Sequence, residues 1–313
     1  MPSLSCLASA RGRALILTAA SAVATALAPA PVMAAAALDA KAISAASGVE
    51  ATTTPDGVVR IGWSRTDVKV TVDGMPLPPA AGLGSWAAFA AMPDGGAMVM
   101  GDTVVFEDEV DAAMDTAFAH GLNVTAIHNH FFHDAPRVFF MHIGGDGDPA
   151  ILAGNVKAVW AAIRAVRTAH PQPVSGFGGA TPVAGKIDAK TLSTIIGKPV
   201  TEIGGVAKIT IGREGRMHGF AIGASMGLTT WIAFSGSDAL AAADGDIIMT
   251  ANEIQPVLRA LRKGGFHVVA LHNHMTGETP SFFFTHFWGK GAAPDLARQF
   301  RAVLDAQAHV NTL

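Results

Sequence analysis

Cysteine and tyrosine are nearly absent from this chain. Among its 313 residues there is no tyrosine, and the one cysteine is Cys6. Cys6 stands within the first 34 residues, which have the pattern of a cleaved leader, so we expect the mature chain to lack cysteine altogether. That expectation excludes disulfide bonds, thiolate metal ligands and a cysteine nucleophile from the mature protein.

The first 34 residues predict a secretory signal peptide (1–34). Two arginines precede an uncharged apolar run at 14–27, and Val32-Met33-Ala34 supplies small residues before the expected cut. This run is shorter than the roughly 20 residues with which a helix crosses a bilayer, which disfavours the alternative of an uncleaved anchor. We therefore expect a periplasmic or secreted protein whose mature chain has no transmembrane segment.

Charge is scarce as well. Only 15% of the residues are charged, and removal of residues 1–34 takes away two of the 22 lysines and arginines and none of the 25 acids. The remaining 20 basic and 25 acidic residues give a net charge of −5. This acidic balance argues against nucleic acid as a partner and against electrostatic docking on anionic lipid. A small-molecule ligand or a component of the cell envelope stays open as a partner.

What the chain does contain is a repeat. The block "AIHNHFFHDAPRVFFMHIGG" begins at Ala126, and "ALHNHMTGETPSFFFTHFWG" begins at Ala270. Flanking segments recur with the same spacing, such as "GDTVVFEDEV" and "GDIIMTANEI". The sequence therefore predicts two homologous repeats, 38–168 and 187–313, joined by a linker at 169–186 that is rich in proline and glycine.

Both repeats show the same order of expected elements. A short helix is predicted at 39–47 and at 188–196, followed by strands and then by an amphipathic helix, which covers 252–263 in the second repeat. Thr250 and Glu253 fit a capping box at the start of that helix, so we interpret Glu253 as a cap rather than a catalytic acid. Strands joined by hairpins and flanked by helices predict an α+β fold with a mostly antiparallel sheet in each half.

The repeated block predicts a hairpin that gathers histidines on one face. Because residues i and i+2 on a strand share a face, His272 and His274 point the same way. A turn near the middle of the block sets His272 opposite Phe284 and His286 opposite Ala270. His286 is then diagonal to His272 on the same face, within reach of its side chain.

Three imidazoles and one carboxylate are therefore expected to converge in each repeat. The two sets are His128, His130, Asp134 and His142, and His272, His274, Glu278 and His286. Because these groups are ligands of transition metals, we predict sites for a divalent metal, with zinc, copper or iron favoured. Two alternatives stay open, a non-metal ligand pocket lined by the same imidazoles and a structural hydrogen-bond network. We also expect the repeats to pack about a pseudo-twofold axis that brings both hairpins into one cleft.

Signals outside the hairpins are weaker. Arg65 and Arg213 recur at the ends of matched strands, where a solvated strand end is commoner than an anion-binding site. The chain has no glycine-rich phosphate loop, no nucleophile elbow and no kinase pattern. Whether the protein is an enzyme, and on what substrate, is not indicated by these patterns.

Three segments resemble the LppY/LpqO family, a domain-of-unknown-function family of exported bacterial proteins: "VTAIHNHFFHDAPRVFFMHIGG", "DGDIIMTANEIQPVLRALRKGG" and "VVALHNHMTGETPSFFFTHFWGKG". The resemblance covers nearly all of the mature chain and implies an exported bacterial protein. It brings no established activity, substrate or catalytic residue. This chain departs from the lipoprotein members of that family because it lacks a well-placed lipid-acceptor cysteine, so the resemblance does not extend to membrane tethering.

Overall fold

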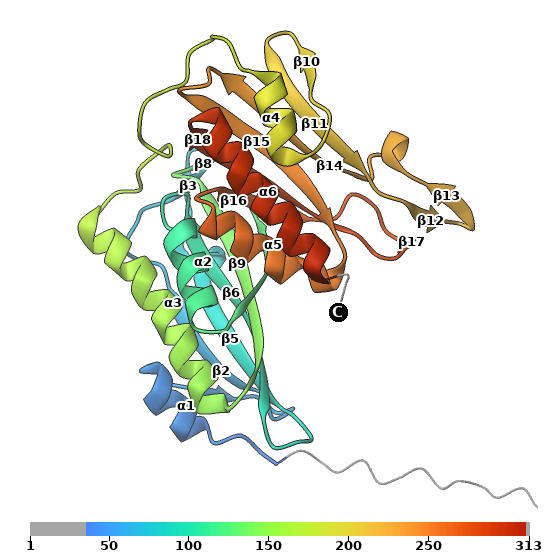
Figure 1. Cartoon of the computed structure of the whole chain (residues 1–313). Helices are drawn as coiled ribbons and strands as arrows, with labels where there is room; N and C mark the ends of the chain where they lie inside the picture. The colour runs from blue at the N-terminus through green and yellow to red at the C-terminus, as the bar shows by residue number, and fades with distance from the viewer. Residues whose placement is uncertain (1–35, 311–313) are drawn as a thin grey trace, which may run out of the picture. The chain divides into compact units, whose positions relative to one another are not determined.

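The two repeats share one large antiparallel sheet. The computed structural model describes residues 36–310, so the predicted signal peptide lies outside the described residues. Within that range the sheet has twelve strands in the order β1-β2-β5-β6-β9-β7-β16-β18-β15-β14-β11-β10 (Figure 1). Its first six strands come from the first repeat and its last six from the second, which confirms the predicted duplicated α+β fold.

The elements of the first repeat are, in chain order, α1 (Ala40–Ser47), β1 (Thr52–Thr53), β2 (Val59–Ser64), β3 (Thr71–Val72), β4 (Met75–Pro76), η1 (Pro79–Ala81), β5 (Gly84–Ala91), β6 (Ala97–Phe106), α2 (Val110–Ala119), β7 (Asn123–His128), β8 (Asp134–Ala135), β9 (Val138–Gly147) and α3 (Pro149–Ala169). The elements of the second repeat are α4 (Ala189–Ile196), β10 (Thr201–Ile203), β11 (Val206–Gly212), β12 (Gly215–Met217), β13 (Phe220–Ile222), η2 (Ala224–Met226), β14 (Thr229–Gly236), β15 (Ala241–Met249), η3 (Ala251–Glu253), α5 (Ile254–Lys263), β16 (His267–His272), β17 (Glu278–Thr279), β18 (Phe283–Gly291) and α6 (Ala293–Val310). Residues 170–188, all of which the structure describes, form neither helix nor strand.

Local sequence signals fix the ends of the short helices. Asp39 and Asp188 each accept hydrogen bonds from two backbone N–H groups of the first turn, which would otherwise lack partners. Gly48 and Gly197 end these helices with φ of 71° and 73°, a left-handed conformation that favours glycine. At the start of η3, the turn that leads directly into α5, the capping box of Thr250 and Glu253 is present, which confirms the interpretation of Glu253 as a cap.

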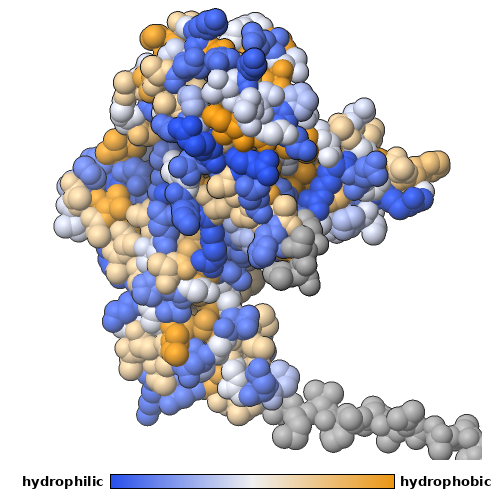
Figure 2. Space-filling view, viewed as in Figure 1, coloured by the Kyte–Doolittle hydropathy of each residue, from blue (hydrophilic) through white to orange (hydrophobic). Residues whose placement is uncertain are grey.

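The helices cover one face of the large sheet, and the apolar core beneath them continues from one repeat into the other. Buried side chains of this core include Met114 and Ile127 from the first repeat and Leu258 and Leu271 from the second. On α6 the buried residues are Ala293, Leu296, Ala297, Phe300 and Val303. Figure 2 shows hydrophilic residues over the outer side of this helix, as an amphipathic helix requires.

The opposite face of the sheet is covered in part by two small sheets. Val105 belongs to the main core, whereas its neighbours Val104 and Phe106 belong to a separate apolar cluster with Phe140. Because successive residues of a strand point to opposite faces, this second cluster lies on the face away from the helices. The three-stranded sheets β4-β3-β8 and β13-β12-β17 occur within the described residues at corresponding places in the two repeats.

The hairpins of the two repeats meet at the centre of the large sheet. Strand β7 pairs with β16, with Ile127 opposite Leu271. Both of these side chains are buried in the shared core. The expectation that the two histidine hairpins lie together is therefore confirmed, and the repeats are joined by backbone pairing as well as by the core.

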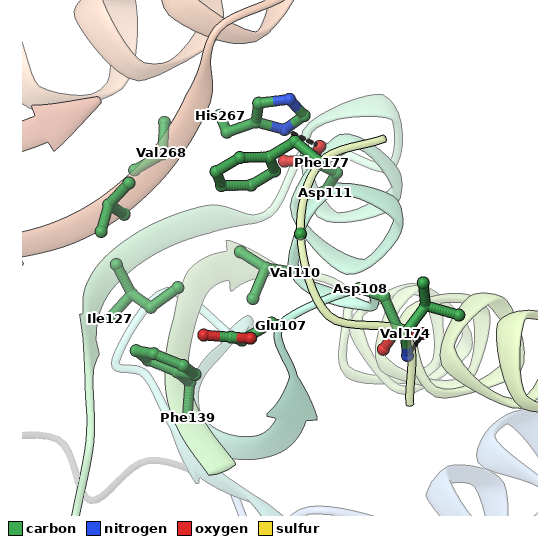
Figure 3. A pocket seen from close by; sticks show the side chains of 12 residues that line it. Glu107, Asp108, Val110, Asp111, Ile127, Phe139, Val174, Phe177, His267 and Val268 are labelled. Carbon is green, nitrogen blue, oxygen red and sulfur yellow. Dashed lines mark hydrogen bonds and ion pairs between the residues drawn. The ribbon is translucent and has the colours of Figure 1, made fainter. Parts of the chain in front are cut away.

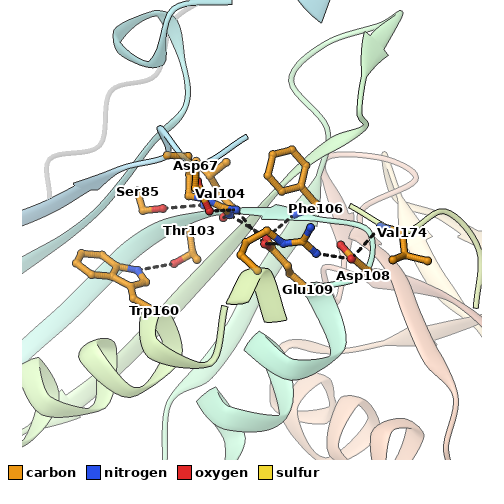
Figure 4. A network of polar contacts seen from close by, with 11 residues as sticks. Asp67, Ser85, Thr103, Val104, Phe106, Asp108, Glu109, Trp160 and Val174 are labelled. Atoms are coloured by element: carbon orange, nitrogen blue, oxygen red, sulfur yellow. Dashed lines mark hydrogen bonds and ion pairs between the residues drawn. The ribbon is translucent and has the colours of Figure 1, made fainter. Parts of the chain in front are cut away.

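The interpretation of Arg65 as a solvated strand end is wrong. Its side chain is fully buried, and its guanidinium donates to both carboxylate oxygens of Glu109, at 2.8 and 2.9 Å, and to Asp67 (Figure 4). Arg167 pairs with Glu109 as well. In the second repeat Arg213 pairs with Glu253 in the same way, at 2.6 Å, with 26% of its side chain exposed. These arginines hold the start of a helix to the sheet.

Candidate metal centres

The backbone register brings the predicted histidines together. In the second repeat His272 lies opposite Phe284, and Ala270 lies opposite His286, as the sequence predicts. The first repeat has the same register, with His128 opposite Phe140 and Ala126 opposite His142. A β-bulge precedes these pairs in both hairpins, between Val268 and Ala270 and between Val124 and Ala126.

The second-repeat centre consists of Asp246, His272, His274 and His286. Asp246, on β15, lies directly opposite His286 on β18. One ligand atom from each of Asp246, His272 and His274 lies within 4.8 Å of the other two. Within this group, His274 Nε2 lies 3.3 Å from Asp246 Oδ2. The arrangement supplies one carboxylate and several imidazoles from three adjacent strands and the turn that follows β16.

Two buried polar atoms of this centre have no hydrogen-bond partner among the described residues. They are Asp246 Oδ1 and His272 Nε2. Burial of an unpaired polar atom is costly, so such an atom can mark a place where a ligand binds. The Nδ1 groups of His272 and His286 are engaged, because they donate to the backbone oxygens of Asn273 and Gly245. These bonds place the ring proton on Nδ1 and leave Nε2 unprotonated. This tautomer is common among metal-binding histidines.

The first-repeat centre has the same composition: Asp102, His128, His130 and His142. His142 Nε2 lies 3.0 Å from His128 Nε2 and 3.9 Å from Asp102 Oδ1. Two nitrogens bound to one zinc at about 2.0–2.1 Å each stand roughly 3 Å apart, so this spacing fits shared coordination. Asp102 Oδ1 is buried without a hydrogen-bond partner among residues 36–310, as Asp246 Oδ1 is.

Aromatic stacking positions the histidine that follows each strand. The ring of His130 stacks on Phe140 with 3.2 Å between centroids, and the ring of His274 stacks on Phe284 with 3.4 Å. Both pairs are nearly parallel, at 7° and 9°. Because the stacked rings cannot turn freely, the imidazoles lose less conformational entropy when a ligand binds.

Burial keeps several of these imidazoles neutral. It lowers the pKa of His274 from 6.5, and the charges of neighbouring histidines lower it further while Asp246 opposes the shift. The pKa of His130 and of His142 is lowered in the same way, with Asp102 as the opposing carboxylate. Only an unprotonated imidazole nitrogen binds metal. The lowered pKa values therefore favour the unprotonated form of His130, His142 and His274 at neutral pH, the form in which an imidazole can act as a ligand.

The predicted carboxylates Asp134 and Glu278 each make a contact within their own hairpin, while Glu278 Oε2 is buried without a hydrogen-bond partner among the described residues. Asp134 Oδ2 accepts the backbone N–H of Val138 at 2.6 Å, and Glu278 Oε1 accepts that of Phe282 at 2.8 Å. Each carboxylate thus braces the turn of its own hairpin. The carboxylates that the structure brings to the histidines are Asp102 and Asp246, which sequence reasoning missed.

A sequence signal for the missed carboxylates did exist. Asp102 and Asp246 occupy the same position in the recurring segments "GDTVVFEDEV" and "GDIIMTANEI". An acid in the middle of an otherwise apolar strand needs a partner, because burial of an isolated charge is costly. The partner could not be named from the sequence, since it lies on a strand far along the chain.

Fold and site define an internally duplicated α+β protein with a histidine–aspartate centre in each repeat. A family model described as Domain of Unknown Function (DUF1259) matches residues 41–162 and 190–306, which is more than half of the chain. The chain belongs to this family, and the two matches fall one in each repeat.

Other comparisons add little. No protein with a curated description matches this sequence. Among solved structures, a trimeric bacterial microcompartment shell protein, PduB, aligns with 83% of this chain and 92% of its own, at 10% identity and a TM-score of 0.20. Similarity of this degree carries no argument about function. No helix within residues 36–310 combines the length and apolarity that a membrane crossing requires.

Proposed function

We propose that this protein binds a divalent transition metal at the second-repeat centre. The observation that carries the proposal is the pair of buried, unpartnered atoms, Asp246 Oδ1 and His272 Nε2, beside His274. A cation placed among them would satisfy both atoms and offset the cost of burying the aspartate. Imidazole and carboxylate ligands suit zinc, copper and iron.

The first-repeat centre is proposed as a second site of the same kind. Support comes from the 3.0 Å between His128 Nε2 and His142 Nε2 and from the unpartnered Asp102 Oδ1. In a purely structural network, two neutral imidazoles would share one hydrogen bond and leave the aspartate oxygen without a partner. A metal ion would use all three atoms at once.

Metal content tests this proposal. Protein purified without a His tag, loaded with zinc and desalted should hold about two equivalents, one per centre, because each centre offers at least three ligand atoms. The variant His272→Ala/His274→Ala should hold about one equivalent, since the first-repeat centre is untouched. Elemental analysis by mass spectrometry measures both values.

A matched control is His170→Ala, an exposed histidine at the end of α3 outside both centres. Its zinc content should equal that of the unaltered protein. Metal-free protein whose unfolding temperature does not rise with zinc, copper or iron would contradict the proposal, because a ligand that binds only the folded state stabilises it.

A binding pocket without metal is the second candidate, and one cavity favours it. A cavity of about 660 Å³ at the join of the repeats is lined by His128 from the first repeat and His272 from the second. Arg137 and the exposed Phe132 lie on its wall. The zinc-loading experiment separates the two candidates, because a pocket that works without metal predicts that the unaltered protein holds no zinc.

We also propose that the protein is exported and that the family resemblance to LppY/LpqO proteins holds. The charged start, the apolar run and the small residues at 32–34 support export. Expressed in a bacterium, the chain should be recovered outside the cytoplasm with Ala35 as its first residue. Intact-mass measurement of the exported protein checks this, and retention of residues 1–34 would contradict it.

A further inference from the structure

A cavity of about 330 Å³ lies beneath the linker, apart from both metal centres, and is called the linker pocket below. Figure 3 shows it between the start of α2, strands β7, β9 and β16, and a segment of the linker. Its volume is at the lower end of the range for small-molecule sites, about 300–1,000 Å³. The pocket therefore suits a ligand of few atoms.

The walls of the linker pocket are apolar and partly aromatic. Val110, Ile127, Phe139 and Val268 form its inner side, and the linker contributes Phe177 and Val174. Phe177 stacks on His267 with 3.9 Å between ring centroids, which holds the linker over the cavity. Phe177 and Val174 remain 48% and 47% exposed, so an apolar ligand would cover surface that the protein leaves in water.

One carboxylate in the linker pocket is uncompensated. Asp108 pairs with Arg167, and Asp111 pairs with Arg262 and contacts His267. Glu107 has no ion pair or hydrogen bond to any residue in the part of the chain that the structure describes. Figure 3 shows its carboxylate among Val110, Ile127 and Phe139. Glu107 is exposed at the edge of the pocket, beside its apolar walls, so a cation can reach its charge from solvent.

The second repeat provides an internal comparison. At the positions of Glu107 and Asp111 it has Ala251 and Gln255. Gln255 bridges α5 to β7, because its side chain donates to the backbone oxygen of Val124 at 2.7 Å and accepts from its N–H at 3.1 Å. The second repeat thus uses this position for a contact between the repeats. The free carboxylate belongs to the first repeat, where the linker adds an aromatic wall.

We propose that the linker pocket binds a small organic cation, an ammonium group attached to an apolar body. The ammonium group pairs with Glu107, and the faces of Phe139 and Phe177 add cation–π attraction. The apolar body lies against Val110 and Val268. A free metal ion is disfavoured here, because the other ionisable groups of the lining are already paired, Asp108 with Arg167 and Asp111 with Arg262 and His267.

Benzylamine, benzyl alcohol and benzoate test this proposal, because they share one ring and differ in charge. In calorimetric titrations of the mature chain at pH 7, benzylamine should bind at one site, at least about tenfold more tightly than benzyl alcohol, as expected for one charge-assisted hydrogen bond. Benzoate should not bind. The variant Glu107→Gln keeps the shape of the side chain and should reduce benzylamine affinity to that of the alcohol.

Two further variants make the result specific. Phe177→Ala should weaken benzylamine binding, whereas Glu202→Gln, at an exposed glutamate on β10, should leave it unchanged. Thermal unfolding shows that each variant is folded. The proposal is overturned if benzylamine binds no more tightly than benzyl alcohol, or if Glu107→Gln retains full affinity.

Discussion

Replacing Glu109 with alanine is expected to lower the free energy of unfolding by about 3–5 kcal/mol, the usual cost of removing one partner of a buried ion pair. Glu109 is fully buried, and it accepts from Arg65, from Arg167 and from the backbone N–H of Phe106. Without it, two guanidinium groups would face each other with only Asp67 and Asp108 to balance them. Urea unfolding followed by circular dichroism measures the change.

Asp67→Ala is the matched control for this prediction. Asp67 also pairs with Arg65, but its side chain is 35% exposed, so water replaces part of the lost contact. Its removal should cost about 1 kcal/mol or less, as for surface pairs. If both variants lose the same small amount of stability, the buried network of Figure 4 contributes little and Glu109 is not what holds α2 to the sheet.

Asp246→Asn should weaken zinc binding at the second-repeat centre by about a hundredfold or more. Loss of a group that only hydrogen-bonds to a metal ligand already lowers metal affinity about 10–100-fold, and Asp246 is proposed as a ligand itself. The substitution keeps the size of the side chain but removes the charge and one strong ligand oxygen. The affinity is measured by competition with a chromogenic zinc chelator, in a His128→Ala/His142→Ala background that removes the first-repeat centre.

Glu278→Gln distinguishes the two candidate carboxylates in that background. Glu278 braces the turn by accepting the N–H of Phe282, and glutamine retains an acceptor oxygen for this contact. Zinc affinity should therefore change by no more than a few-fold. A large loss in Glu278→Gln together with a small one in Asp246→Asn would show that the turn carboxylate is the ligand, as the sequence spacing alone suggests.

Local patterns predicted the elements of this fold well. The two short helices start after Asp39 and Asp188, where an acid caps the first turn, and they end at glycines. The hairpin register followed from the position of the turn, which set His272 opposite Phe284. In each case the physical cause lies within a few residues of the effect, so it can be read from one stretch of sequence.

Long-range partners were not predictable in the same way. Asp246 reaches the histidines through the pairing of β15 with β18, and β15 comes before α5 in the chain. Arg65 is buried against Glu109, 44 residues away, although its position at the end of a strand predicts a side chain exposed to solvent. Which distant strand lies beside a given strand depends on the packing of the whole sheet, and the alternation of apolar residues along one strand does not specify it.

The sequence by itself determined the duplication, the α+β class, the histidine hairpins and the face on which their imidazoles gather. Only the tertiary structure showed that Asp102 and Asp246 lie beside the histidines, that Asp134 and Glu278 accept backbone N–H groups of their own turns, and that β7 pairs with β16 to join the repeats in one sheet. The division has a physical reason. Turn and strand geometry is set by neighbouring residues, whereas a buried carboxylate takes whichever partners the assembled sheet brings within a few ångströms.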